Sequence, residues 1–190
     1  MSYKMLVPPF KRVEFSKMNK EQAKEYFEWY ISQIDKRIDL LFDAVKKDGV
    51  AAKFDYSKES LIDLWSWYET KISYRKLDEL EYEKIVAKYP DWMHEYISKT
   101  ELSFETLMYG MDVALYFAKV VIINNRDKVK WGYYTKPKNR DSVNQPVLLG
   151  FMNGMDLNPR LIVINCTRRS GREKKSTRLI EIYNNWMEYL

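Results

Sequence analysis

The sequence has very little of the two residue types on which most nucleophilic and metal-dependent enzymes rely. Of 190 residues, one is cysteine and one is histidine. A lone cysteine, Cys166, excludes an internal disulfide and a multi-cysteine zinc site, and a lone histidine, His94, excludes His-rich metal sites. A serine or cysteine triad would have to use His94 as its base. We read His94 as an ordinary partly buried side chain and Cys166 as a small core residue, and we expect no metal, no cofactor and no enzymatic activity.

Glycine and proline are scarce as well, with six residues of each. Sandwiches and barrels need many turns built from these residues, so the composition favours helices. Neither phosphate-binding glycine motif, G-x-x-x-x-G-K-[ST] or G-x-G-x-x-G, is present. The N-terminal residues contain no apolar run followed by a small-residue cleavage site, so we expect a cytoplasmic protein.

The residues that are present suffice for one packed domain. Hydrophobic residues make up 46% and aromatic residues 15% of the chain, far from the composition of a disordered segment. We expect residues 1–190 to form a single domain, with a helical part at about 16–125 and a small sheet plus a final helix at about 126–190. The predicted fold class is mainly α with a small antiparallel β part, an α+β fold.

Amphipathic helices are predicted in the first half of the chain. Residues 20–48 carry apolar positions at steps of three and four and end before Gly49. Asn19 is the candidate cap, with Gln22 at the spacing of a capping box. A bend near Ser32 would divide this segment into two helices. Similar patterns predict further helices at about 57–72 and 75–89.

The segment 104–124 is apolar almost all the way round, apart from a narrow strip that includes Asp112 and Lys119. It is long enough to span a bilayer, but each of these charges near its middle would cost about 2.5–3.5 kcal/mol there. We therefore predict a central buried helix packed by the amphipathic ones, and no membrane. Small residues four apart, at 110, 114 and 118, would allow a neighbouring backbone to approach closely.

Helical periodicity stops after about residue 125. Short runs rich in β-branched and aromatic residues follow at 130–134, 147–151 and 161–165, separated by Asn, Gly and Pro. This pattern predicts an antiparallel meander at about 130–165. A last amphipathic helix is predicted at about 172–189.

Positive charge is concentrated late in the chain. Residues 126–178 hold 13 Lys and Arg against 4 Asp and Glu, a net charge of +9. A basic face with aromatic side chains could attract an acidic protein partner, or nucleic acid or another polyanion, although no nucleic-acid motif is present. The alternative is a solvated basic face whose aromatic rings point to the core. The candidate binding residues are Trp131, Tyr133, Lys136, Lys138, Arg140, Arg168, Arg169 and Arg172.

Two tryptophans do not fit the amphipathic pattern. Trp29 and Trp67 fall away from the apolar stripes of their predicted helices. Exposed tryptophans often anchor interfaces, so these two are candidate interface residues for a homodimer or another partner. The alternative is that each packs under a second layer of helices.

An enzyme that works without histidine or cysteine is a further alternative. It would use a buried carboxylate or lysine, for which Asp112 and Lys119 are the candidates because they share one strip of an apolar helix. The competing reading is structural: an ion pair, or hydrogen bonds to Tyr109 and Tyr116.

From about residue 6 to the C-terminus, the chain resembles a family of uncharacterised small bacterial cytoplasmic proteins. The segments that carry the resemblance are Val7–Lys11, Tyr26–Trp29 with Ile34–Ile38, Trp131–Tyr133 with Thr135–Lys138, and Asn144–Phe151 with Asn158–Pro159. The family has no agreed activity, and its outline is similar to that of small bacterial accessory proteins, some of them toxin-immunity proteins. The resemblance implies a binding or accessory role, which is the function we prefer.

Overall fold

The apolar segment forms the central helix α4, Phe104–Asn124, in the computed structural model, which describes residues 3–190. Ser103 caps this helix by accepting a hydrogen bond from the amide of Thr106. Thirteen of its 21 residues are buried. By length and composition α4 could cross a membrane, but most of its apolar part is covered by the rest of the protein. The prediction of a buried central helix is confirmed.

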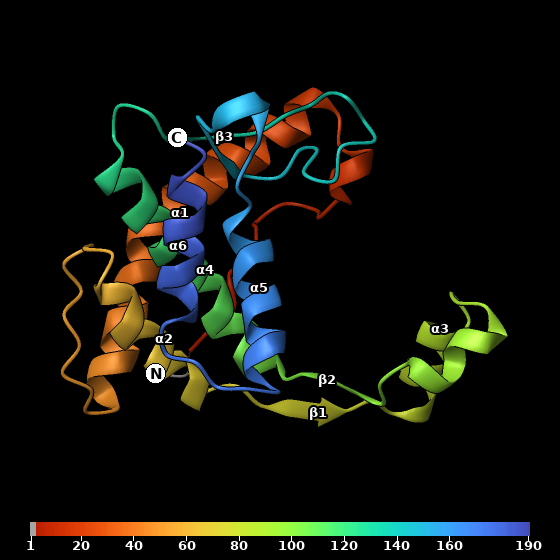
Figure 1. Ribbon diagram of the computed structural model, residues 1–190. Helices are drawn as coiled ribbons and strands as arrows, with labels where there is room; N and C mark the ends of the chain where they lie inside the picture. The colour runs from red at the N-terminus through yellow and green to blue at the C-terminus, as the bar shows by residue number, and fades with distance from the viewer. Residues whose placement is uncertain (1–2) are drawn as a thin grey trace.

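Four helices pack around α4 and one another (Figure 1). They are α1 Lys20–Lys47, α2 Ser60–Thr70, α5 Pro159–Ser170 and α6 Arg178–Met187. The capping box predicted at Asn19 and Gln22 opens α1. This helix continues through Ser32, whose hydroxyl donates to the carbonyl of Trp29, so it is not divided into two. The last helix begins later than the predicted residue 172, at Arg178.

The stripe of small residues on α4 meets α2 and α5. A Cβ added at Gly110 would lie 2.5 Å from the hydroxyl of Tyr68 and 3.8 Å from a methyl group of Val163. The Tyr68 hydroxyl is itself placed by hydrogen bonds to the carbonyl of Thr106 and the hydroxyl of Thr167, both at 3.1 Å. Glycine at position 110 therefore lets three helices meet closely.

The predicted meander is only partly correct. Strands β3, Lys130–Gly132, and β4, Val147–Leu149, form an antiparallel pair with Trp131 opposite Leu148. The third predicted strand, 161–165, is wrong because these residues belong to α5. Asn158 caps that helix by accepting from the amide of Leu161 at 3.2 Å, and Pro159 occupies its first turn.

A second strand pair supports an arm, residues 74–102, that projects from the body (Figure 1). Strands β1, Tyr74–Lys76, and β2, Thr100–Leu102, are antiparallel. Between them lie helix α3, Glu79–Val86, and the 3-10 helix η2, Asp91–Tyr96. The predicted helix at 75–89 is thus shorter, and its first residues are strand. Two more 3-10 turns, η1 Phe15–Lys17 and η3 Met152–Gly154, complete the elements.

Candidate functional site

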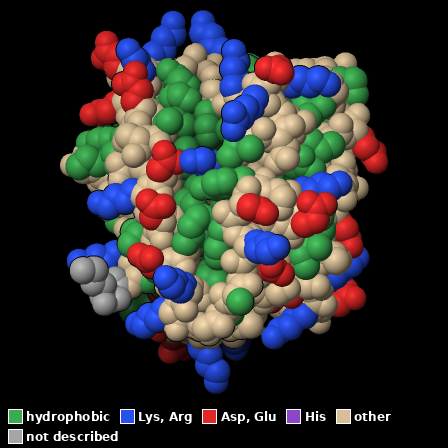
Figure 2. Space-filling model, turned by 90° about the vertical axis from the view of Figure 1, so that its left-hand side faces the viewer, with side chains coloured by type: hydrophobic (Ala, Val, Ile, Leu, Met, Phe, Trp, Pro, Cys, Tyr) green, Lys and Arg blue, Asp and Glu red, His purple; other side chains and the backbone are tan. Residues whose placement is uncertain are grey.

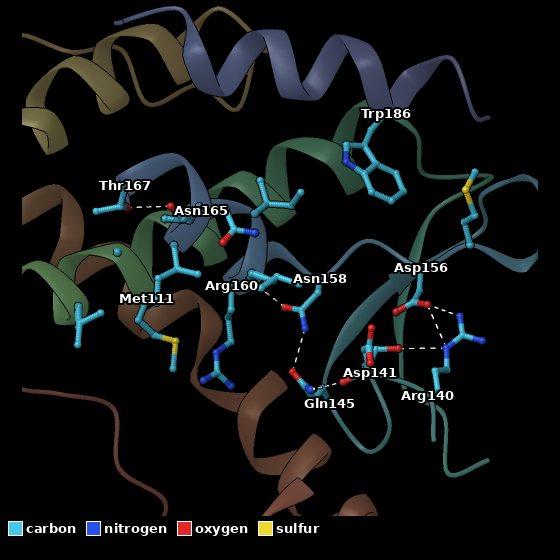
Figure 3. A pocket seen from close by; sticks show the side chains of 18 of the residues that line it. Met111, Arg140, Asp141, Gln145, Asp156, Asn158, Arg160, Asn165, Thr167 and Trp186 are labelled. Atoms are coloured by element: carbon cyan, nitrogen blue, oxygen red, sulfur yellow. Dashed lines mark hydrogen bonds and ion pairs between the residues drawn. The ribbon is translucent and has the colours of Figure 1, made fainter. Parts of the chain in front are cut away.

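A groove with a volume of about 1160 Å³ follows α5 on the surface of the body. We call it the α5 groove. Its walls come from α4, α5, α6, the N-terminal segment and residues 140–158, and Figure 3 shows α5 running through its middle. The apolar side chains that define it include Met5, Leu107, Met111, Leu161, Ile164 and Trp186. Leu161 is 52% exposed although it is a leucine on a packed helix. The groove is therefore an apolar surface open to solvent.

Arg160, in the first turn of α5, is a charged groove residue that has no counter-ion within residues 3–190 (Figure 3). Its Cζ lies 5.9 Å from the ring centre of Phe15. Within residues 3–190, its Nη1 atom is buried without a hydrogen-bond partner, and no carboxylate forms an ion pair with it. A buried charged donor without an acceptor is costly, but the Arg160 side chain as a whole is only half-buried, so the accessible part of its guanidinium can receive a carboxylate from outside the chain.

Two further buried polar atoms lack partners close to Phe15. Burial raises the pKa of Tyr30, the nearby positive charge of Arg160 opposes that shift, and the Tyr30 hydroxyl makes no hydrogen bond within residues 3–190. Asn144 donates through its side chain to the carbonyl of Phe15 at 2.6 Å, but its own Oδ1 accepts nothing within the same residues. Both residues are fully buried and lie outside the groove lining, so these two atoms belong to the interior of the fold.

The other polar side chains near the start of α5 are satisfied by bonds within the chain (Figure 3). The Asn158 amide donates to Gln145 Oε1 at 2.9 Å, and Gln145 donates to the Asp141 carbonyl at 2.8 Å. Arg140 donates through Nε to Asp156 Oδ1 at 3.1 Å and also lies over the ring of Tyr134. Arg140 lines the groove as a predicted binding residue, but its charge is already neutralised.

The predicted aromatic platforms point inward. Trp131 packs edge-on against Tyr30 with ring centres 5.7 Å apart, and Tyr133 lies 4.8 Å from Phe27. Both side chains are half-buried. They reinforce the contact of β3 with α1, and they leave little ring surface on which a base could stack.

The predicted basic residues do not form one surface. Lys136 and Lys138 are exposed in the turn after β3, where the Lys138 ammonium donates to the Met18 carbonyl at 2.9 Å. In contrast, three exposed arginines lie in the last turn of α5 or directly after it, and the end of this helix of 12 residues is about 18 Å from its start. These three are Arg168, Arg169 and Arg172. The basic segment is therefore divided between the two ends of α5.

The two candidate interface tryptophans are both covered. Trp67 is only 3% exposed, its ring centre lies 5.2 Å from that of Tyr109, and its Nε1 donates to Asp48 at 2.7 Å. The expectation of an exposed tryptophan at this position is wrong, because the helix packs on two sides. Trp29 is half-buried beneath the N-terminal segment, 5.9 Å from the ring centre of Phe10.

The strip on α4 is structural. Asp112 accepts hydrogen bonds from Arg37 Nε at 2.8 Å and from the hydroxyl of Tyr3. Its side chain is fully buried and does not line the α5 groove. Burial raises the pKa of Asp112, and the bonds from Arg37 lower it. Lys119 instead pairs with the exposed Asp35. Asp112 and Lys119 thus have partners other than Tyr109 and Tyr116, and the two charged side chains do not contact each other.

The remaining candidate side chains offer little chemistry. His94 lies on the arm, where its Nε2 is 3.0 Å from the Tyr89 carbonyl. Cys166 is buried, and burial raises the pKa of its thiol, which disfavours the reactive thiolate. In the part of the chain that the structure describes, no three His, Cys, Asp or Glu side chains lie close enough together to hold a metal ion.

A second apolar area lies on the opposite side of the body from the arm. Figure 2 shows this face, with a band of hydrophobic side chains between Lys, Arg, Asp and Glu of mixed sign. The loop of residues 48–59, at the left of Figure 1, belongs to it. Here Phe54 stacks on Phe42 with ring centres 4.2 Å apart, and Tyr56 stacks on Tyr116 at 5.2 Å. These rings hold the loop on α1 and α4, so they are already used in packing.

The α5 groove is therefore the candidate site in the structure, and of the binding residues predicted from the sequence only Arg140 lines it. The chain matches no protein-family model, no curated protein and no solved structure.

Proposed function

We propose that this chain is a non-enzymatic binding protein whose α5 groove holds an apolar, acidic segment of a protein partner. The observation that carries the proposal is the buried, unpartnered Nη1 of Arg160 in a groove that is otherwise mainly apolar. A ligand that satisfies both features has an apolar body and a carboxylate, and a charge-assisted bond would fix its orientation.

The dimensions favour a chain segment over a small molecule. Pockets for small ligands typically enclose about 300–1000 Å³ and bury most of the ligand. The α5 groove is larger, at about 1160 Å³, and follows a helix of 12 residues. An amphipathic helix or extended peptide docks in such grooves through apolar anchors at regular spacing.

One charge in the groove supports an acidic partner. The lining carries Arg140 and Arg160 against Asp141 and Asp156, and Arg140 is paired with Asp156, so Arg160 is the cation in the lining that has no carboxylate partner within residues 3–190. Nucleic acid is the weaker candidate, because Trp131 and Tyr133 are packed against α1 and the arginines at 168, 169 and 172 lie at the far end of α5. A protein carboxylate needs only the one guanidinium that is free.

The proposal predicts that the groove binds the dye anilinonaphthalene sulfonate, which combines an apolar body with an anionic group. Dilute wild-type protein should enhance its fluorescence in a saturable way. Arg160→Gln should raise the dye Kd about tenfold, because a hydrogen bond to a charged group contributes about 1.5–3 kcal/mol. Leu161→Glu should abolish binding by placing a carboxylate in the groove.

The matched control is Lys138→Gln, which also removes one positive charge but lies outside the groove lining. It should leave the dye Kd unchanged. If Arg160→Gln binds the dye as tightly as wild type, Arg160 is not the anion-binding group and the proposal is wrong.

A further inference from the structure

The arm is a built structure that touches little of its own body. Helix α3 and η2 have no buried residue. The arm is nevertheless held in shape: a capping box of Asp78 and Glu81 opens α3, and Arg75 donates to Glu81 at 2.8 Å and pairs with Glu101. A rigid projection of this kind keeps its surface ready for a partner.

The exposed surface of the arm is apolar and acidic at once. Leu80 is 67% exposed, Trp92 is 71% exposed and Tyr96 is 75% exposed. Large apolar side chains exposed to water on one small element often mark an interaction site. Residues 78–96 also carry six Asp and Glu against two Lys, a net charge of −4. The arm tip, residues 78–96, thus has both properties that the α5 groove requires of its ligand.

The arm leaves the body at the edge of this same groove. Leu102, the last residue of β2, lines the groove, and so does Leu107 in the first turns of α4. The tip, however, points away from α5 of its own chain (Figure 1). The paired strands hold it there, so the arm of a second copy is better placed to reach the groove.

We infer that two copies of this chain exchange arms, so that the tip of each lies in the α5 groove of the other. This inference rests on the proposed function, because it names the occupant of that groove. Trp92 and Tyr96 supply the apolar anchors that cover Leu161, and the carboxylate of Asp91 or Glu95 reaches Arg160. The charges are complementary at one point, where the unpaired guanidinium of Arg160 would meet a tip whose net charge is −4.

The exchange of arms gives a closed assembly with two-fold symmetry. A two-fold axis makes the two arm–groove contacts identical, which gives a dimer and no open chain of subunits. The 3-10 helix η2, which carries the proposed anchors, has 6 residues and is about 12 Å long, so it fits along α5, which has 12 residues and is about 18 Å long.

Sedimentation velocity over a range of protein concentrations tests the exchange. Wild type should be a dimer. The arm variant Trp92→Ser/Tyr96→Ser and the groove variant Leu161→Glu should each raise the dimer Kd at least tenfold, and all three positions are exposed in the body and arm of one copy, so the fold should persist. Circular dichroism checks that it does.

Mixing the two variants is the decisive part of this experiment. The arm variant keeps an intact groove and the groove variant keeps an intact arm, so one contact is restored and a one-to-one dimer should form. Val50→Ser, which removes an exposed apolar side chain outside both surfaces, should dimerise like wild type.

Two outcomes overturn the exchange: a wild type that stays monomeric at every concentration, or a dimer that survives both sets of substitutions. A monomeric protein that binds the dye through Arg160 would remove the exchange and leave the proposed groove ligand standing. Dye binding that is insensitive to Arg160→Gln would remove the groove ligand, whatever the oligomeric state.

Discussion

Asp112→Ala should lower the free energy of unfolding by about 3–5 kcal/mol, because the substitution leaves a buried guanidinium without its counter-ion. Arg37 is only 6% exposed and donates to both oxygens of Asp112, while its third contact is the Lys4 carbonyl at 2.7 Å. Tyr3 also donates to the same carboxylate. The loss would be a large part of the 5–15 kcal/mol by which a typical domain is stable.

Lys119→Ala is the matched control for that substitution. It removes a charge from the same helix, but its ion pair with Asp35 is exposed, with 80% of the Asp35 side chain in water. An exposed pair contributes about 0–1 kcal/mol, so this variant should stay within that range of wild type. Urea denaturation followed by circular dichroism measures both values. Equal effects of the two substitutions would contradict the assignment of Asp112 as the buried anchor.

Glu69→Ala should lower the free energy of unfolding by about 2–4 kcal/mol, because buried donors would lose their only acceptor. The carboxylate of Glu69 accepts from the indole of Trp65 at 3.1 Å, from the hydroxyl of Ser170 and from the backbone amide of Lys175 at 2.9 Å. It therefore joins α2 to the end of α5 and to the loop before α6.

Glu181→Ala is the control for this second substitution. Glu181 also contacts Lys175, through an ion pair of 2.8 Å, but both side chains are 47% exposed. Its removal should change the unfolding free energy by less than about 1 kcal/mol. Thermal melting of both variants distinguishes them. A Glu181→Ala variant as unstable as Glu69→Ala would show that the buried carboxylate of Glu69 stabilises the fold no more than an exposed one.

The predictable parts of the fold are those whose sequence pattern is compatible with only one structure. A segment of 21 residues that is apolar on nearly every side must be surrounded, and α4 is. The box at Asn19 and Gln22 marked the start of α1 for the same reason, since its hydrogen bonds are local. Mainly helical structure with a small β part follows from these elements and from the short β3–β4 pair.

Helix α5 was missed because two signals conflicted. The run Leu161–Asn165 is rich in β-branched residues, but Asn158 and Pro159 are a helix start, and Val163, Cys166 and Ser170 recur at helical spacing on the buried side. Packing on α4 decided the outcome against the β propensity. The consequence was large, because the α5 groove exists only if this segment is a helix.

For the arm, the sequence predicted a helix but not its exposure to solvent. Residues 75–89 carry an apolar pattern at helical steps, which predicts a helix that packs on a core. The pattern is real, but none of the residues of α3 is buried and Leu80 is 67% exposed in a single copy. One sequence does not tell whether such a face meets its own body or another chain. Arg160 was likewise hidden among 13 basic residues of its segment, because a missing acceptor is visible only in three dimensions.

The central claim is that the α5 groove of one chain holds the arm tip of another, and a pair of engineered cysteines tests that contact directly. The native Cys166 is buried and leaves the surface free of thiols in the described residues. Glu95→Cys on the tip and Asn165→Cys in the groove are both at exposed positions. Mixed and mildly oxidised, the two single variants should give a covalent dimer on a non-reducing gel, in excess of what either gives alone. A mixture that forms no more dimer than the separate variants would contradict the account.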